Sequence, residues 1–172
     1  MLRMNLLIVV SPAGAAIVAD LGMTLGLTSE SGPLAPYQER SLIVKIAIVG
    51  SRGFDNAAII AQSIRRWMVL APEGLTIVSG GARGADRIGE DIAYDLSIPI
   101  VIHLPDWGKF GKSAGFIRNA LIVRDADVVL AFFAPGPRSK GTADTVARAK
   151  LAGKAVYEYH EGAWYSHEVL AL

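Results

Sequence analysis

The sequence has no cysteine among its 172 residues. Neither a disulfide framework nor a thiolate metal site can therefore form within this chain. It also lacks an excess of charge of either sign, since 17 lysines and arginines are balanced by 16 acidic residues and leave a formal net charge of +1. A chain this close to neutrality has no overall field that would draw it to nucleic acid or to a membrane surface. Any anion-binding function must therefore depend on a local site.

Histidine is also scarce, and the three histidines, His103, His160 and His167, do not have the spacing of metal ligands. We therefore expect no metal ion, and no motif in the sequence indicates a cofactor. The absence of cysteine fits a reducing compartment, so we expect a cytoplasmic protein without a membrane partner.

Residues 1–41 are expected to be an extension rather than part of the domain. Met4 to Ala19 carry no charge, but Pro12 and Gly14 interrupt this apolar run, which is too short to span a membrane. The following stretch is rich in glycine, serine, proline and threonine and is typical of a linker. We expect the extension to be poorly ordered or the product of a misassigned start site, in preference to a secretory signal.

From residue 43 onward, β-branched apolar runs alternate with segments of helical periodicity. This alternation predicts an α/β fold, a Rossmann-like, doubly wound three-layer sandwich with a five-stranded parallel sheet in the order 3-2-1-4-5. The domain spans residues 42–160, and a short tail with an apolar composition, 161–172, could pack on a second copy in a homodimer. The predicted strands are 43–49, 75–78, 98–104, 127–133 and 155–157, and the predicted helices run from a cap at Asp55 or Asn56 to Pro72, then over 85–96, 113–124 and 142–152.

Glycine-containing loops follow the first, second and fourth predicted strands. Parallel strands bring their carboxyl ends to one edge of a sheet, where ligands of this fold class bind. Glycine permits close backbone approach, and a helix N-terminus offers free N–H groups and partial positive charge to a phosphate. We predict ligand contacts from Gly50, Ser51 and Arg52 in the first loop, from Ser79, Gly80, Gly81, Arg83 and Gly84 in the second, and from Ser139, Lys140, Gly141 and Thr142 in the third.

Residues 106–119 supply a further polar and aromatic stretch. Asp106 and Trp107 are candidate ligand contacts, because an indole ring can stack on a base, although a loop aromatic packed on the core is the common alternative. Arg118 and Asn119 could hydrogen-bond a ribose or a base. Asp86 and Asp144 are the candidate catalytic carboxylates, and capping of the following helix is the alternative role for Asp86.

Taken in order, these motifs resemble those of the YspA-like branch of the SLOG superfamily. The segments that carry the resemblance are Val49–Arg52, Val78–Asp86, Asp106–Trp107, Ala114–Asn119 and Ser139–Thr142. The superfamily also includes DprA (Smf) proteins and LOG phosphoribohydrolases, and many members of the branch are phage-encoded. The resemblance implies a Rossmann-like domain that binds nucleotides or nucleotide-derived ligands.

The resemblance leaves three functions open. The first is a sensor or sequestering module for a nucleotide-derived small molecule. The second is hydrolysis of the N-glycosidic bond of nucleoside monophosphates, as in LOG enzymes, but Thr145 stands where their catalytic glutamate would be. The third is binding of single-stranded DNA, as in DprA, which the nearly neutral charge disfavours. Whether the protein is an enzyme is therefore left open by the sequence.

Overall fold

The computed structural model describes residues 7–10, 16–19 and 43–167, which belong to two compact units, Met1–Arg40 and Ser41–Leu172. In the first unit, β1 (Leu7–Val10) pairs antiparallel with β2 (Ala16–Ala19). The expectations for the rest of the 1–41 extension, and for residues 168–172 of the tail, lie outside the described residues.

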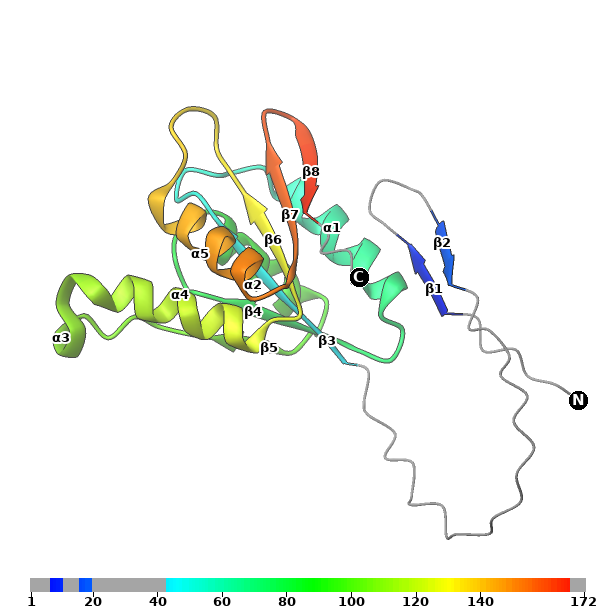
Figure 1. Ribbon diagram of the computed structural model, residues 1–172, viewed down its shortest axis with the longest axis horizontal. Helices are drawn as coiled ribbons and strands as arrows, with labels where there is room; N and C mark the ends of the chain where they lie inside the picture. Colours follow the sequence, from blue (N-terminus) through cyan, green and yellow to red (C-terminus); the bar gives the residue numbers. More distant parts are fainter. Residues whose placement is uncertain (1–6, 11–15, 20–42, 168–172) are drawn as a thin grey trace, which may run out of the picture. The chain divides into compact units, whose positions relative to one another are not determined.

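The second unit is an α/β fold built on a mixed, mostly parallel sheet of six strands in the order β5-β4-β3-β6-β7-β8 (Figure 1). The five strands from β5 to β7 are mutually parallel, and β8 pairs antiparallel with β7 at one edge. Their bounds are β3 Val44–Gly50, β4 Leu75–Ser79, β5 Ile100–Ile102, β6 Val128–Phe132, β7 Ala155–His160 and β8 Ala163–His167.

The predicted five-stranded parallel sheet was wrong in strand count and in the order at this edge, because β8 extends it. A two-residue turn makes the extra strand possible: His160 pairs with Ala163, and both Glu161 and Gly162 have positive φ, 53° and 79°. Such a turn matches the twist of a β-hairpin, but glutamate is an unusual residue at positive φ. The sequence therefore gave little sign that its tail would turn back and join the sheet.

Helices cover both faces of the sheet (Figure 1). Ile46 and Ile48 of β3 pack in a core cluster with residues of α1 and α2, whereas Ala47 and Val49 pack in a second cluster with residues of α4 and α5. This alternation follows from the period of two in a strand and gives three layers. The helices are α1 Ala57–Leu70, α2 Ala85–Asp95, α3 Trp107–Phe110, α4 Ala114–Asp125 and α5 Lys140–Leu151, with a 3-10 turn, η1 Gly111–Ser113, between α3 and α4.

The starts of two helices can be compared with the sequence predictions. Asn56, one of the two predicted caps, accepts a hydrogen bond from the Ile59 amide at 3.2 Å and begins α1. The fourth predicted helix begins two residues earlier than expected, at Lys140, so that Gly141 and Thr142 belong to its first turn.

None of the helices within the described segments is both long enough and apolar enough to cross a membrane.

The added strand is expected to contribute to stability through Trp164, whose ring centroid lies 5.5 Å from that of Phe132 and 5.3 Å from that of Tyr159. We predict that Trp164→Ala lowers the free energy of unfolding by about 1–3 kcal/mol, because this partly exposed ring covers the end of the buried core. Chemical denaturation measures the change. Tyr94→Ala, at an 80% exposed position on α2, is the control. An equal loss of unfolding free energy in both variants would contradict the stabilising role of Trp164.

Candidate functional site

A cavity of about 430 Å³ opens at the carboxyl ends of β3 and β6. These two strands are neighbours, and the chain leaves them in opposite directions across the sheet, so the cavity occupies the topological switch point of the fold. Its walls come from the β3–α1 loop, the start of α2, one face of α4, the β6–α5 loop and the start of α5. Of the predicted contacts, Gly50, Ser51, Arg52, Arg118, Asn119, Ser139, Gly141 and Thr142 line it, as does the candidate carboxylate Asp86.

The first loop is fixed at its base and open at its tip. The Ser51 amide donates to the Phe132 carbonyl at 2.9 Å, and the Phe54 amide donates back to the Ser51 carbonyl at 3.0 Å. Arg52 is exposed at the tip, where its side chain can reach a ligand in the cavity. The loop therefore offers an exposed cation on a rigid support.

Two of the predicted glycines are required by close packing within the chain itself. A Cβ on Gly50 would lie 2.5 Å from both the Ala85 Cβ and the Phe132 carbonyl oxygen. Gly84 has φ of +80°, and a Cβ there would lie 2.3 Å from the Ser51 carbonyl oxygen. These contacts let the start of α2 press directly against the end of β3 and its loop. The two glycines therefore allow the close contact between the first and second loops, which both border the cavity.

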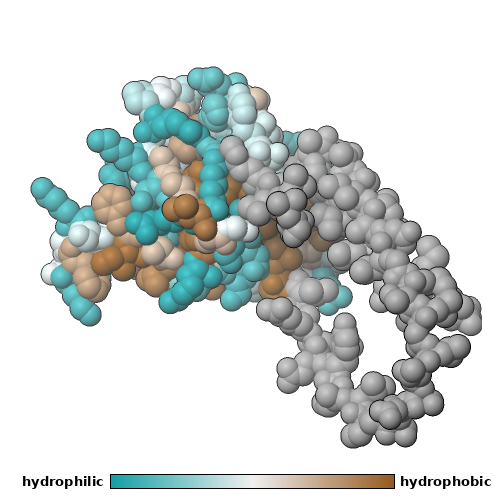
Figure 2. All heavy atoms as spheres, viewed as in Figure 1, coloured by the Kyte–Doolittle hydropathy of each residue, from teal (hydrophilic) through white to brown (hydrophobic). Residues whose placement is uncertain are grey.

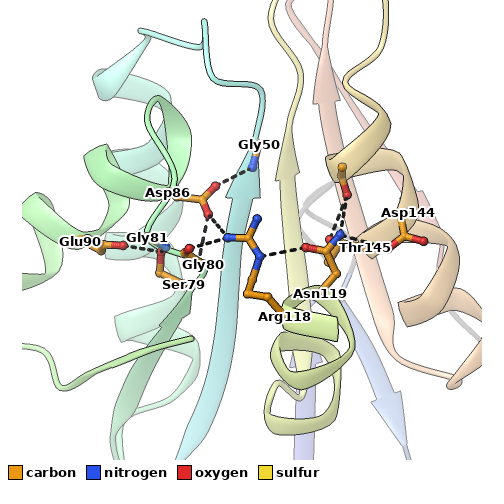
Figure 3. A network of polar contacts seen from close by, with 11 residues as sticks. Gly50, Ser79, Gly80, Gly81, Asp86, Glu90, Arg118, Asn119, Asp144 and Thr145 are labelled. Atoms are coloured by element: carbon orange, nitrogen blue, oxygen red, sulfur yellow. Dashed lines mark hydrogen bonds and ion pairs between the residues drawn. The ribbon is translucent and has the colours of Figure 1, made fainter. Parts of the chain in front are cut away.

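Asp86 joins two of the loops from inside the protein (Figure 3). Its carboxylate is 3% exposed and accepts hydrogen bonds from the Gly50 amide at 3.1 Å and the Gly80 amide at 3.2 Å. Burial raises the pKa of Asp86 to about 6, against the opposing effect of the Arg118 charge and of the amide hydrogen bonds. These amides lie outside α2, whose N-cap residue is Gly84 with no side-chain cap hydrogen bond among the described residues, so the alternative role of Asp86 as a helix cap is wrong.

Arg118 reaches across the sheet from α4 to the second loop. Its guanidinium donates to the Gly80 carbonyl and lies 3.9 Å from the Asp86 carboxylate (Figure 3). A Cβ on Gly80 would lie 1.9 Å from the Arg118 Nη1, so the absence of a side chain there makes room for the guanidinium. Burial lowers the pKa of Arg118, although the nearby Asp86 opposes this. The arginine is thus a half-buried structural cation as well as part of the cavity wall.

Asn119 continues the same network toward α5 (Figure 3). Its Oδ1 accepts from the Arg118 Nε at 3.0 Å, and its Nδ2 donates to the Gly141 carbonyl at 3.2 Å and to the Asp144 carboxylate at 3.0 Å. Asp144 also pairs with Arg148 at 2.8 Å. Asp144 is not among the residues that line the cavity, so of the two candidate catalytic carboxylates only Asp86 reaches it.

The start of α5, where this network ends, forms a further wall of the cavity. Ser139 is the N-cap residue, and no side chain among the described residues caps this helix. Ser139, Gly141 and Thr142 line the cavity, and a Cβ on Gly141 would meet no neighbouring element within 4 Å. The uncapped first turn of a 12-residue helix, with the partial positive charge of its amides, therefore belongs to the cavity wall.

Several predicted contacts lie outside the cavity lining. Ser79 donates to the buried Glu90 carboxylate at 2.6 Å, and Asp106 caps α3 by accepting from the Lys109 amide at 2.9 Å. Trp107 is 54% exposed and lies beside Gly115. The remaining predicted contacts that do not line the cavity are Gly80, Gly81, Arg83, Gly84 and Lys140.

Three residues with defined positions near the site were not among the predicted contacts. Thr145 is buried, lines the cavity and donates to the Gly141 carbonyl at 3.1 Å. Glu90 and Glu158 are buried carboxylates, at 4% and 2% exposure. The burial of Glu158 could have been predicted from the strand pattern of residues 155–160, because alternation along a strand places Glu158 on the same face as the apolar Val156.

Residues 111–115 read Gly-Lys-Ser-Ala-Gly, the spacing of a nucleophile elbow. The elbow requires a sharp turn between a strand and a helix, whereas Ser113 ends the 3-10 turn η1 between two helices and is exposed. The structure therefore gives this serine no nucleophile geometry. Among the residues that the structure describes, no three acidic or histidine side chains gather as ligands of a metal ion would.

Comparisons with known proteins agree with this architecture. Residues 44–110 match the YAcAr family model, described as the YspA, cpYpsA-related SLOG family. The chain is 36% identical over 121 residues to the Gene 61 protein of Mycobacterium phage D29, covering 67% of this chain and 95% of that protein. It is also similar to the X-ray structure of DNA processing protein A (DprA) from Streptococcus pneumoniae, with a TM-score of 0.54 and 20% identity. That match covers 67% of this chain but only 50% of the DprA chain, and it shows a shared fold.

The raised pKa of Asp86 predicts a specific pH dependence of stability. Because the folded protein holds this proton up to about pH 6, and the unfolded chain loses it near 3.8, ionisation costs stability as the pH rises between these values. Relative to Asp86→Asn, the wild type should therefore lose about 3 kcal/mol of unfolding free energy between about pH 4 and pH 7. Urea unfolding of both proteins across this range measures the difference, and a constant difference would contradict the assigned pKa.

Proposed function

Since this chain belongs to the YspA, cpYpsA-related SLOG family, we propose that its cavity binds a nucleotide or a nucleotide-derived ligand that carries a phosphate. The protein would act as a sensor or sequestering module for that ligand. The observation that carries the proposal is the uncapped start of α5, which faces the cavity beside the exposed Arg52. The Rossmann-like, doubly wound arrangement predicted from the sequence places ligands at this same point.

The phosphate is expected to bind against the first turn of α5. Amides that have no partner at a helix start combine hydrogen-bond donors with partial positive charge, which suits an anion. Gly141 leaves the approach open, and the hydroxyls of Ser139 and Thr142 stand beside it in the cavity wall. Arg52 can close on the phosphate from the opposite loop, because its side chain is exposed at the cavity.

The rest of the ligand would fill the space toward Asp86 and Arg118. The volume of about 430 Å³ lies within the range of roughly 300–1,000 Å³ typical of small-molecule sites. A carboxylate and an arginine at one end complement the hydroxyl groups of a ribose or the edge of a base. Hydrogen bonds to the Gly50 and Gly80 backbone already hold these groups in place, so binding would cost little side-chain conformational entropy.

One observation favours hydrolysis of an N-glycosidic bond as a second candidate function. Asp86 lines the cavity, and its pKa of about 6 lets it hold or release a proton near neutrality. In such a reaction water would add to the sugar carbon, and the base would leave with a proton. The glutamate of LOG enzymes is replaced by Thr145, so Asp86 would have to act as the acid or base.

Thermal unfolding of the full chain against a ligand panel tests the proposal. The panel contains inorganic phosphate, nucleoside mono- and diphosphates, ADP-ribose, NAD, cyclic nucleotides, adenosine and a short single-stranded DNA. A ligand at about 100 times its Kd adds roughly 2.7 kcal/mol, which raises the Tm by several degrees. We expect a shift with one class of phosphate-bearing nucleotide and none with adenosine. A shift with DNA alone would favour the DprA-like hypothesis, and release of free base from a bound nucleotide would identify the hydrolase.

A charge placed at the start of α5 should abolish phosphate binding without harming the fold. Gly141 has free space around its Cβ position, and an aspartate in the first turn favours a helix, so Gly141→Asp should fold. Its carboxylate would repel the phosphate and weaken binding of the nucleotide from the panel by at least about tenfold. Gly141→Asn has nearly the same shape without the charge and should stay within about threefold of the wild type. Calorimetric titration compares the three proteins, and equal losses in both variants would rule out a phosphate at this helix.

A further inference from the structure

A buried carboxylate lies in β7 beneath the helix that would hold the phosphate. Glu158 is 2% exposed and pairs in register with Ala131 of β6. The alternation along β7 puts it on the same face as Val156, which packs with Val146 and Ala149 of α5. A strand that faces a helix normally fills such a position with an apolar residue, because burial of an unpaired charge is costly.

Two cations hold this carboxylate. The Lys150 Nζ of α5 lies 2.8 Å from the Glu158 Oε1, and the Arg138 Nη2 pairs with the Oε2. The Arg138 guanidinium also lies 4.2 Å from the centre of the Phe133 ring. Burial alone would raise the pKa of Glu158, but the hydrogen bonds and charges of Lys150 and Arg138 outweigh it and lower this pKa. Glu158 is therefore an ionised group whose two oxygens are each bound by a separate element.

Arg138 connects this buried pair to the cavity. It immediately precedes Ser139, the N-cap residue of α5, and follows Pro137, and both of these neighbours line the cavity. The loop that contains them rises beside the β7–β8 hairpin (Figure 1). It includes Gly136 at φ of +98°, a backbone conformation that glycine adopts readily.

We propose that Glu158 is a positioning residue: by holding Arg138 it fixes the β6–α5 loop and aims the first amides of α5 into the cavity. The inference rests on the proposed function of this cavity in binding phosphate. It assigns the half-exposed Arg138 to an ion pair with a buried carboxylate. The same carboxylate holds Lys150 near the other end of α5, so a single buried group sets both ends of the helix.

Amide hydrogen exchange tests the positioning role without any ligand. Glu158→Gln should raise the exchange rates of residues 143–146, whose amides are the first in α5 with hydrogen-bond partners, by at least about tenfold relative to the wild type, because the neutral amide no longer holds Arg138. Exchange in β4, on the far side of β3 from β6, and in α1, on the opposite face of the sheet, should change much less. Glu73→Gln makes the same chemical change at an exposed site in the α1–β4 loop and should leave residues 143–146 unaffected. Unchanged exchange of this segment in Glu158→Gln would overturn the proposal.

Binding measurements with AMP and inorganic phosphate add the functional readout. We expect Glu158→Gln to weaken both probes by at least about tenfold, whereas Glu73→Gln binds them like the wild type. Arg138→Gln, at a half-exposed position, should fold and reproduce the loss, and the double variant should lose no more than either single variant. Additive losses, or wild-type affinity in Glu158→Gln, would overturn the positioning role while the proposed function stands. Failure of the wild-type protein to bind either probe would instead count against the phosphate site itself.

Discussion

The arrangement of the cavity depends on one partly buried contact, the guanidinium of Arg118 against the carbonyl of Gly80. Arg118 belongs to α4, on one face of the sheet, whereas Gly80 precedes α2, on the other face. The contact therefore crosses the switch point between β3 and β6. Asp86 on one side and Asn119 on the other extend it into a continuous polar network that reaches the start of α5 (Figure 3).

Charged side chains also lie in the interior of the domain. Figure 2 shows brown, apolar residues interspersed with teal, hydrophilic ones over the face in view. In the interior, Asp86 and Glu158 are nonetheless buried, each held by arginine, backbone amides or lysine. An unpaired charge at either position would cost several kcal/mol, so each carboxylate fixes the groups around it as firmly as they fix the carboxylate. The polar network is thus a structural constraint first and a binding surface second.

Local signals in the sequence were enough to predict the α/β fold, the cap at Asn56 and the convergence of three loops on one edge of the sheet. The periodicity of apolar residues and the turn residues act within a few positions, which is why they can be read along the chain. Partners that meet across the sheet could not be predicted in this way. The pairing of Arg138 with Glu158 joins residues 20 positions apart, and that of Arg118 with Gly80 joins residues 38 apart, and only the fold brings them together. The glycines of the second loop were predicted to admit a ligand, but Gly80 and Gly84 admit other parts of the same chain.

The bridge formed by Arg118 also has a kinetic consequence. Two halves of a site joined by a half-buried arginine cannot separate as independent bodies without breaking the hydrogen bond that this arginine donates across the sheet. A ligand would therefore enter through the side on which Arg52 and Gly141 are exposed, with no domain opening beforehand. Association would then be a single step whose observed rate rises linearly with ligand concentration, as for a rigid receptor, and differences in affinity between ligands would appear mainly as differences in residence time.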